Sequence, residues 1–179
     1  IGLQRPGSIF FGLGDASGYA RNELQHASDS SNCPQCSAPL SYKHVTLSHM
    51  GDWKCENCDL TRPRLDFETS QIQLDGLNQS EFTIHGKSGR HEISSSMPGL
   101  HNVYNALAAF SAASEIGIDH DGIASSISQT VAAFGRTEKI EINDREIHIL
   151  LAKNPAGANA NIDTLLLHSG PLHLCVLLN

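Results

Sequence analysis

The sequence predicts an α/β protein that carries an inserted four-cysteine zinc ribbon and continues into the start of a second α/β unit. Two C-x₂-C pairs between residues 33 and 58 predict the ribbon. Alternating apolar residues between 65 and 97 predict a meander of β-strands, and helical spacing over 98–117 predicts a buried helix. We expect a first unit at 1–135, with the ribbon at about 31–64, and a second unit at 136–179.

Composition indicates a folded, globular protein. Of the 179 residues 40% are hydrophobic and 17% are charged, which argues against wholesale disorder. The formal net charge of −7 provides no basic field that would attract nucleic acid or anionic lipid. The longest apolar runs, such as 172–178, are too short to span a bilayer, and no secretory leader opens the chain. We therefore expect a cytoplasmic protein.

Both ends of the chain suggest a segment of a longer protein. The first residue is Ile1 rather than Met, and the last residue, Asn179, directly follows a strand-like apolar run. We therefore expect further sequence on both sides of these residues.

The cysteine spacing is the most specific chemical pattern in the chain. Two C-x₂-C knuckles separated by eighteen residues match a tetrahedral zinc ribbon, in which each knuckle turns two sulfurs toward one metal. Paired disulfides are disfavoured in a cytosolic chain, and a redox C-x-x-C motif needs no second copy. A small module buries little apolar surface, so we expect structural zinc to supply much of its folding free energy. The predicted ligands are Cys33, Cys36, Cys55 and Cys58.

Two further interpretations of the ribbon need to be weighed. His44 and His49 lie between the knuckles and could replace a thiolate, although four cysteines already complete the ligand set. Many zinc ribbons bind nucleic acid, but the two lysines and two acidic residues between Cys33 and Cys58 balance to zero. A non-enzymatic zinc-ribbon protein that binds nucleic acid or another protein remains the alternative function.

Strands surround the ribbon in the expected first unit. The run 8–13 predicts a buried strand that ends in a glycine loop, and the polar residues 21–32 predict a connector. Within the ribbon we expect a hairpin with its turn at Gly51-Asp52. Downstream, alternation predicts three strands, around Ile72, Phe82 and Ile93.

The helix predicted over 98–117 has a polar start. His101 and Asn102 lie four and three residues before Asn105, and therefore on the same face as Asn105. The first turn of a helix has free amides and the positive end of the macrodipole, which favours a nucleotide or phosphate. The alternative is that Asn102 merely caps the helix and that His101 is a loop residue, since Asn is a favoured N-cap. Gly117 is the expected left-handed stop.

The rest of the chain predicts a second helix, a hairpin and a βαβ unit. Asp119 or Asp121 caps the helix, which Gly135 closes, and its apolar face is Ile123, Ile127, Val131 and Phe134. A turn at Asn143-Asp144 joins the hairpin, whose second strand we expect to be buried through Leu151. After a polar loop at 152–159, a helix starting at Asn161 or Asp163 and a buried strand at 172–178 complete the unit; Cys175 is a small hydrophobe in that strand.

Three segments together resemble the Mur ligases, the ATP-dependent enzymes of peptidoglycan precursor assembly. GLHNVYNALAA at 99–109 resembles their G-x-H-N-x-x-N-x-x-A-A segment, and FGRTEK at 134–139 resembles their Gly-Arg-x-Glu joint. LAKNPAGAN at 151–159 departs from the Asp-and-His loop of most members. Combined with an inserted four-cysteine ribbon, this loop resembles one branch, the synthetase subunits that amidate lipid II.

The resemblance implies a fold and a nucleotide site. The first unit would be the C-terminal part of a Mur ligase ATP-binding middle domain, and the second the start of a Rossmann-like C-terminal domain. The residues that would contact the nucleotide, ATP with Mg²⁺, are His101, Asn102, Asn105 and Arg136. No G-x-x-x-x-G-K-[ST] phosphate loop occurs in this chain, so we expect that loop upstream and do not expect the segment to act alone.

The resemblance also implies a reaction and a partner. The enzyme would amidate the D-glutamate α-carboxylate of the lipid II stem peptide, at the membrane surface, through an acyl phosphate. No cysteine of this chain suits a glutaminase nucleophile, because the ribbon uses four and Cys175 is expected in an apolar strand. Ammonia would come from a GatD-type glutamine amidotransferase subunit in a heterodimer. The resemblance assigns no catalytic residue within these 179 positions.

Overall fold

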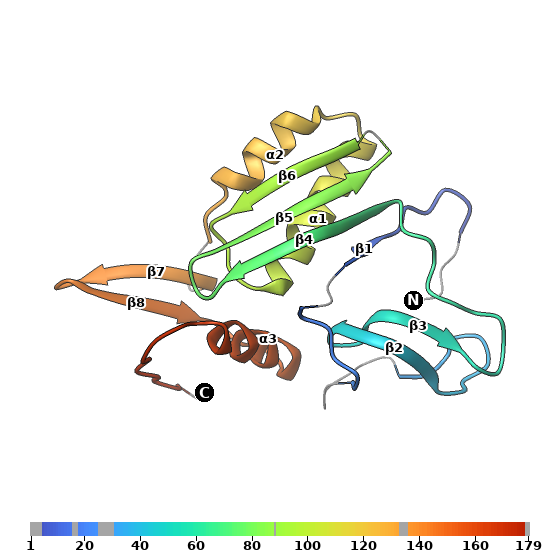
Figure 1. Cartoon of the computed structure of the whole chain (residues 1–179), viewed down its shortest axis with the longest axis horizontal. Helices are drawn as coiled ribbons and strands as arrows, with labels where there is room; N and C mark the ends of the chain where they lie inside the picture. The colour runs from blue at the N-terminus through green and yellow to red at the C-terminus, as the bar shows by residue number, and fades with distance from the viewer. Residues whose placement is uncertain (1–4, 16–17, 25–30, 88, 133–135, 178–179) are drawn as a thin grey trace.

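A four-stranded sheet with helices α1 and α2 on one face forms the largest part of the molecule (Figure 1). The computed structural model describes residues 5–15, 18–24, 31–87, 89–132 and 136–177. The strand order is β1-β4-β5-β6; β1 runs parallel to β4, and the other pairs are antiparallel. The elements are β1 (Phe11–Leu13), β4 (Phe67–Asp75), β5 (Gln79–Gly86), β6 (Gly89–Ser95), α1 (Leu100–Glu115) and α2 (His120–Gln129). The predicted meander and buried helix are confirmed.

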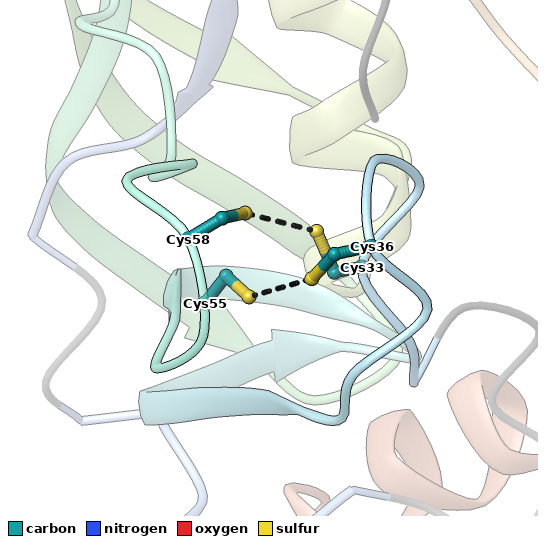
Figure 2. Close-up of side chains that lie close together, drawn as sticks. All are labelled: Cys33, Cys36, Cys55 and Cys58. Atoms are coloured by element: carbon teal, nitrogen blue, oxygen red, sulfur yellow. Dashed lines mark hydrogen bonds between the residues drawn. The ribbon is translucent and has the colours of Figure 1, made fainter.

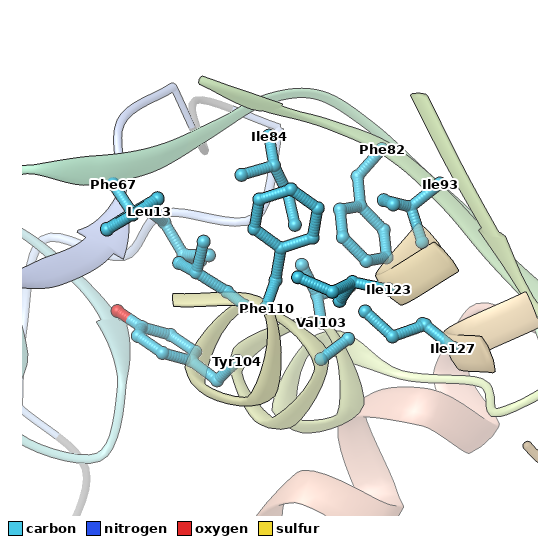
Figure 3. Close-up of a cluster of buried hydrophobic side chains, with 12 residues drawn as sticks. Leu13, Phe67, Phe82, Ile84, Ile93, Val103, Tyr104, Phe110, Ile123 and Ile127 are labelled. Carbon is cyan, nitrogen blue, oxygen red and sulfur yellow. The ribbon is translucent and has the colours of Figure 1, made fainter. Parts of the chain in front are cut away.

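The main hydrophobic core lies between this sheet and the two helices (Figure 3). Phe110 of α1 is fully buried at its centre, with its ring edge-on to Phe67 of β4 at a centroid distance of 6.3 Å. The alternation of the strands and the helical period of α1 thus point toward the same core. Its other labelled members are Leu13, Phe82, Ile84, Ile93, Val103, Tyr104, Ile123 and Ile127.

The ends of the two helices follow local chemistry. Gly117 follows α1 with φ +84°, the left-handed conformation expected of it. Asp119 is the N-cap of α2, and its carboxylate accepts from the Gly122 amide at 2.9 Å. The helix ends at Gln129, because Thr130 is extended and its hydroxyl donates back to the Ser126 carbonyl.

The predicted length of the second helix is therefore wrong. Val131, expected on its buried face, lies beyond the helix and is 76% exposed. Phe134 and Gly135 lie outside the described residues. Ile123 and Ile127 alone bury the apolar face of α2 among the described residues.

The ribbon is a two-stranded antiparallel hairpin of β2 (Leu40–Leu47) and β3 (Met50–Cys55). Its turn is Ser48-His49, not the expected Gly51-Asp52. Gly51 lies within β3 opposite Val45, where a methyl group would overlap the His44 carbonyl oxygen. The glycine thus permits a close approach of two strands rather than a turn.

Residues 136–177 form a hairpin and a helix: β7 (Arg136–Ile142), β8 (Arg145–Leu150) and α3 (Pro155–Leu166). Asn143 and Asp144 both have positive φ, so the predicted turn is confirmed. The buried strand expected through Leu151 is not found: β8 is partly exposed, and Leu151 itself is 48% exposed.

Helix α3 begins earlier than predicted. Asn154 is the N-cap, its side-chain oxygen accepts from the Gly157 amide at 2.7 Å, and Pro155 takes the first helical position. Asn followed by Pro is a helix start, because proline needs no amide partner there and has a helical φ. The helix therefore starts at Pro155, and not at Asn161 or Asp163 as the sequence predicts.

The predicted buried strand at 172–178 is wrong over the residues that the structure describes. Positions 171–177 have no regular secondary structure, and Leu174, Val176 and Cys175 are exposed. Consequently the expected βαβ unit is not formed by the described residues, in which β7 and β8 are antiparallel. In the part of the chain described here, no helix is both long and apolar enough to cross a bilayer.

Candidate functional site

The four predicted ligands converge at one end of the ribbon hairpin (Figure 2). Their sulfur atoms all lie within 4.8 Å of one another, with Cys33 3.6 Å from Cys58 and Cys36 3.5 Å from Cys55. A zinc ion bound tetrahedrally at about 2.3 Å places its sulfurs about 3.8 Å apart. The geometry therefore fits one tetrahedral metal ion, and none of the five cysteines forms a disulfide.

Each knuckle has the same local hydrogen bond. The Gln35 amide donates to the Cys33 sulfur and the Asn57 amide donates to the Cys55 sulfur, both at 3.4 Å. Such N–H donors stabilise thiolates, the form in which cysteine binds a metal. The two knuckles thus present a matched pair of pre-oriented ligands.

Without a bound cation, the pKa values of Cys36 and Cys58 shift in opposite directions. The Asn57 side chain, followed by the Ala38 backbone, lowers the pKa of Cys36 to about 6. Although the Leu60 backbone lowers it, burial and the other three sulfurs raise the pKa of Cys58 to about 12. Sulfurs this close cannot all carry a negative charge at neutral pH unless a dication joins them.

A small apolar cluster packs against cysteines of the ribbon. Leu40, Trp53 and Leu60 pack around Cys33 and Cys55 and are separate from the main core. This cluster is too small to fold a module by itself, which favours a structural metal. His44 and His49 do not belong to the metal-ligand group found among the described residues.

The start of α1 contains the second set of predicted residues. Asn102 is buried inside the helix, so it is not the N-cap; Gly99 takes that position without a side-chain cap. The Asn102 amide donates to the Pro98 carbonyl at 2.8 Å, and its oxygen accepts from the exposed Asn105 amide at 3.2 Å. The structure thus places Asn102 in a fixed role: it holds the first turn and orients Asn105.

His101 is largely buried, and burial lowers the pKa of its imidazole below 6.5. Its Nδ1 is buried and has no hydrogen-bond partner among the described residues. The ring is therefore neutral at physiological pH and has an unused polar atom at the helix start.

His101 lines a cavity of about 280 Å³ that several parts of the chain build together. One wall is the first turn of α1, and another is α3, with Asp163 and Thr164. Thr46 and Leu47 form a third side. They lie at the inner end of the ribbon hairpin, which is the end with the Ser48-His49 turn. The remaining lining residues are Gly18, Tyr19, Ala20, Arg21, Leu74, Leu100, Ala160, Leu166 and Leu167.

Arg136, the fourth predicted nucleotide residue, is the first residue of β7. Its side chain lies outside what the structure describes. The structure brings together His101, Asn102 and Asn105 at the start of α1.

The residues that complete the cavity have no recognisable pattern in the sequence. Arg21 forms an ion pair with Asp163, 142 positions later, and its backbone pairs with Val45 of the ribbon. Arg21 was assigned to a polar connector and Asp163 to a helix start, since no local pattern indicates a contact across that separation. The sequence does not indicate a role for Thr46 either, because a single threonine in a strand is common.

The chain has relatives among known proteins. No protein-family model matches the chain. It is 38% identical over 147 residues to the lipid II isoglutaminyl synthase (glutamine-hydrolyzing) subunit MurT of Streptococcus pneumoniae, covering 82% of this chain and 32% of that protein. MurT of Staphylococcus aureus is 27% identical over 140 residues, covering 78% and 30%. The chain thus spans about a third of the length of these curated relatives.

The fold has a solved counterpart as well. A pseudomurein peptide ligase type C from Methanothermus fervidus matches with a TM-score of 0.74 and 29% identity, over 89% of this chain and 31% of that one. The four-cysteine cluster and the α/β arrangement are the features that the sequence predicted for a Mur ligase segment. On sequence and fold together, the chain belongs to the Mur ligase family, in the branch of MurT.

Proposed function

We propose that the protein containing this chain uses ATP to amidate the D-glutamate α-carboxylate of the lipid II stem peptide, giving D-isoglutamine. The observation that supports this most is the 38% identity to a MurT subunit over 82% of the chain. The geometry adds support, because the four ribbon cysteines converge and Asn102 orients Asn105 at the start of α1.

The chemistry explains the need for ATP. A carboxylate is a poor electrophile, because its charge repels a nucleophile and oxide is not a leaving group. Transfer of the γ-phosphoryl group gives an acyl phosphate and ADP; ammonia then attacks the carbonyl carbon and inorganic phosphate leaves. The phosphate loop and the catalytic residues for these steps are expected outside the 179 residues.

The base of the nucleotide is the part that this chain would bind. Asn105, oriented by Asn102, offers both a donor and an acceptor for the edge of adenine. The neutral His101 ring faces a cavity whose volume, about 280 Å³, is near the small end for ligand sites, and suits a base rather than a whole nucleotide. Arg136 would bond a ribose or phosphate oxygen through its fork of N–H donors. Mg²⁺ would accompany the phosphates.

The cysteine cluster would hold one structural Zn²⁺. Four thiolates fill a tetrahedral sphere and leave no position for a catalytic water. When bound, the metal supplies folding free energy to the ribbon and joins its two knuckles. We assign residues 1–135, ribbon included, to the middle domain and 136–179 to the start of the C-terminal domain. In support, the main core includes none of the side chains that the structure describes after residue 136.

A second subunit would supply the nitrogen. A glutaminase needs an exposed nucleophilic cysteine and a histidine base beside it. Cys175 is exposed rather than buried, but no histidine is paired with it among the described contacts. We therefore propose a GatD-type glutamine amidotransferase as partner and lipid II at the cytoplasmic membrane surface as acceptor.

The test uses the full-length protein with ATP, lipid II and a nitrogen source. We expect amidation with ammonium salts by the single chain, and with glutamine only when the second subunit is added. Absence of amidated lipid II under every condition would refute the function, and glutamine-driven amidation by the single chain would refute the partner.

A further inference from the structure

The ribbon hairpin extends from the metal centre to the cavity. At one end Leu40 pairs with the ligand Cys55, and at the other end Leu47 pairs with Met50. Eight residues of β2 span about 26 Å at the usual rise of a strand. One rigid element therefore has the zinc knuckles at one end and the cavity wall at the other.

Thr46, near the inner end, makes the hydrogen bond on which the inference depends. Its side chain is buried, and its Oγ1 lies 3.0 Å from the Tyr104 hydroxyl of α1. The same Oγ1 donates to the Met50 carbonyl at 3.1 Å. A hydroxyl has one proton, so Tyr104 is the donor and Thr46 the acceptor.

Tyr104 connects this hydrogen bond to the nucleotide residues. It lies three residues after His101 and four after Leu100, hence on the same face of α1. In Figure 3 its phenol oxygen points away from the apolar core while its ring stays within it. Thr46, Leu100 and His101 all line the cavity.

Other contacts also hold the inner end of the hairpin in place. The backbones of Val45 and Arg21 exchange two hydrogen bonds, of 2.7 and 2.8 Å, and Leu47 and Met50 pack against the main core. Among the contacts described between ribbon and α1, however, Thr46–Tyr104 is the side-chain hydrogen bond that joins the two.

We propose that Thr46 and Tyr104 are positioning residues of the nucleotide site. Their hydrogen bond holds the ribbon hairpin as a wall of the cavity and sets the position of the first turn of α1, with His101 and Asn105, against the base. This inference rests on the proposed function, because it takes ATP as the ligand. The ribbon is then part of the binding site as well as a metal-stabilised insert.

The test compares Thr46→Val and Tyr104→Phe with the parent in the full-length protein. We expect each to weaken binding of a fluorescent ATP analogue about three- to tenfold, the order expected for one neutral hydrogen bond. The KM for ATP should rise by the same factor, while kcat and the KM for ammonium stay unchanged. Thr46→Ser, which keeps the hydroxyl, should bind like the parent, and the double variant should be no weaker than either single one.

Matched variants separate positioning from folding. Thr61→Val makes the same change at an exposed ribbon residue. Tyr42→Phe removes a hydroxyl that donates a hydrogen bond to the His49 carbonyl within the ribbon. Both should bind the analogue like the parent, and all variants should keep one zinc per chain. Unchanged affinity in Thr46→Val and Tyr104→Phe would overturn the inference, and so would an equal loss in the controls. A parent that binds no nucleotide would instead overturn the proposed function together with it.

Discussion

Gly99 and Thr164 meet where the start of α1 faces α3. Gly99 has φ +92°, and a methyl group on it would overlap the Thr164 hydroxyl. Glycine is therefore required here for two reasons: its backbone conformation, and the close approach of α3. The contact joins residues 65 positions apart in the sequence, and Thr164 also lines the cavity.

The Gly99→Ala substitution should separate these two requirements. We expect it to lower the free energy of unfolding by about 1–3 kcal/mol, because strain and steric overlap both act. Gly117→Ala is the matched control, since Gly117 has φ +84° but open space around it. Urea unfolding of both variants measures the difference, and equal losses would show that α3 does not pack against Gly99.

The metal centre should hold one zinc through sulfur alone. Elemental analysis of the reduced protein should give one zinc per chain, with sulfur scatterers at about 2.3 Å. Cys55→Ser should lose the metal and much of the stability together, whereas Cys175→Ser, the same change at an exposed cysteine outside the cluster, should keep both. A nitrogen ligand from His44 or His49, or a folded reduced protein without zinc, would contradict the assignment.

Zinc binding should release protons and weaken in acid. The pKa of Cys58, raised to about 12, means that this thiol is protonated at neutral pH without the metal. Binding must displace that proton, so affinity rises with pH and falls as pH drops and more cysteines become protonated. Competition with a chelator at pH 8 and pH 6, corrected for the chelator's own protonation, measures this. Equal affinity at both pH values would show that the thiols do not bind as thiolates.

The His101 ring should make the protein less stable in acid. Burial lowers the pKa of His101, so the unfolded chain takes up a proton more readily than the folded one. Its contribution to stability is fully present above about pH 6.5 and is lost as pH falls from there toward the lowered pKa. Unfolding at pH 7.5 and 5.5 should show a smaller acid loss in His101→Gln than in the parent. His173→Gln, at an exposed ring, should match the parent.

Substitution of Asn105 and Arg136 tests the proposed nucleotide site. In the full-length protein, Asn105→Ala and Arg136→Ala should each lower kcat/KM for ATP by an amount equivalent to about 1–3 kcal/mol. This is the cost of removing one hydrogen-bonding partner of the nucleotide. Glu115→Ala, at the other end of α1, serves as control. If both variants use ATP as well as the parent does, the nucleotide site lies elsewhere.

Sequence alone determined the features that depend on short spacing. The two C-x₂-C knuckles specify a four-sulfur site because each knuckle needs only four residues to orient two ligands. Alternation specified β4, β5 and β6, and the helical period specified α1, since the same apolar residues must face one core. The grouping of His101, Asn102 and Asn105 followed from the geometry of a single helix turn.

Only the tertiary structure decided which residues meet across the chain. The Arg21–Asp163 pair, the Thr46–Tyr104 hydrogen bond and the Gly99–Thr164 approach join residues 58 to 142 positions apart, and no local pattern encodes such contacts. The structure also decided that Asn102 is a buried internal residue and that Asn154 with Pro155 begins α3. The exposed run at 171–177 shows the opposite limit: a short apolar run predicts a buried strand, but a strand forms only where a neighbouring backbone provides its hydrogen bonds.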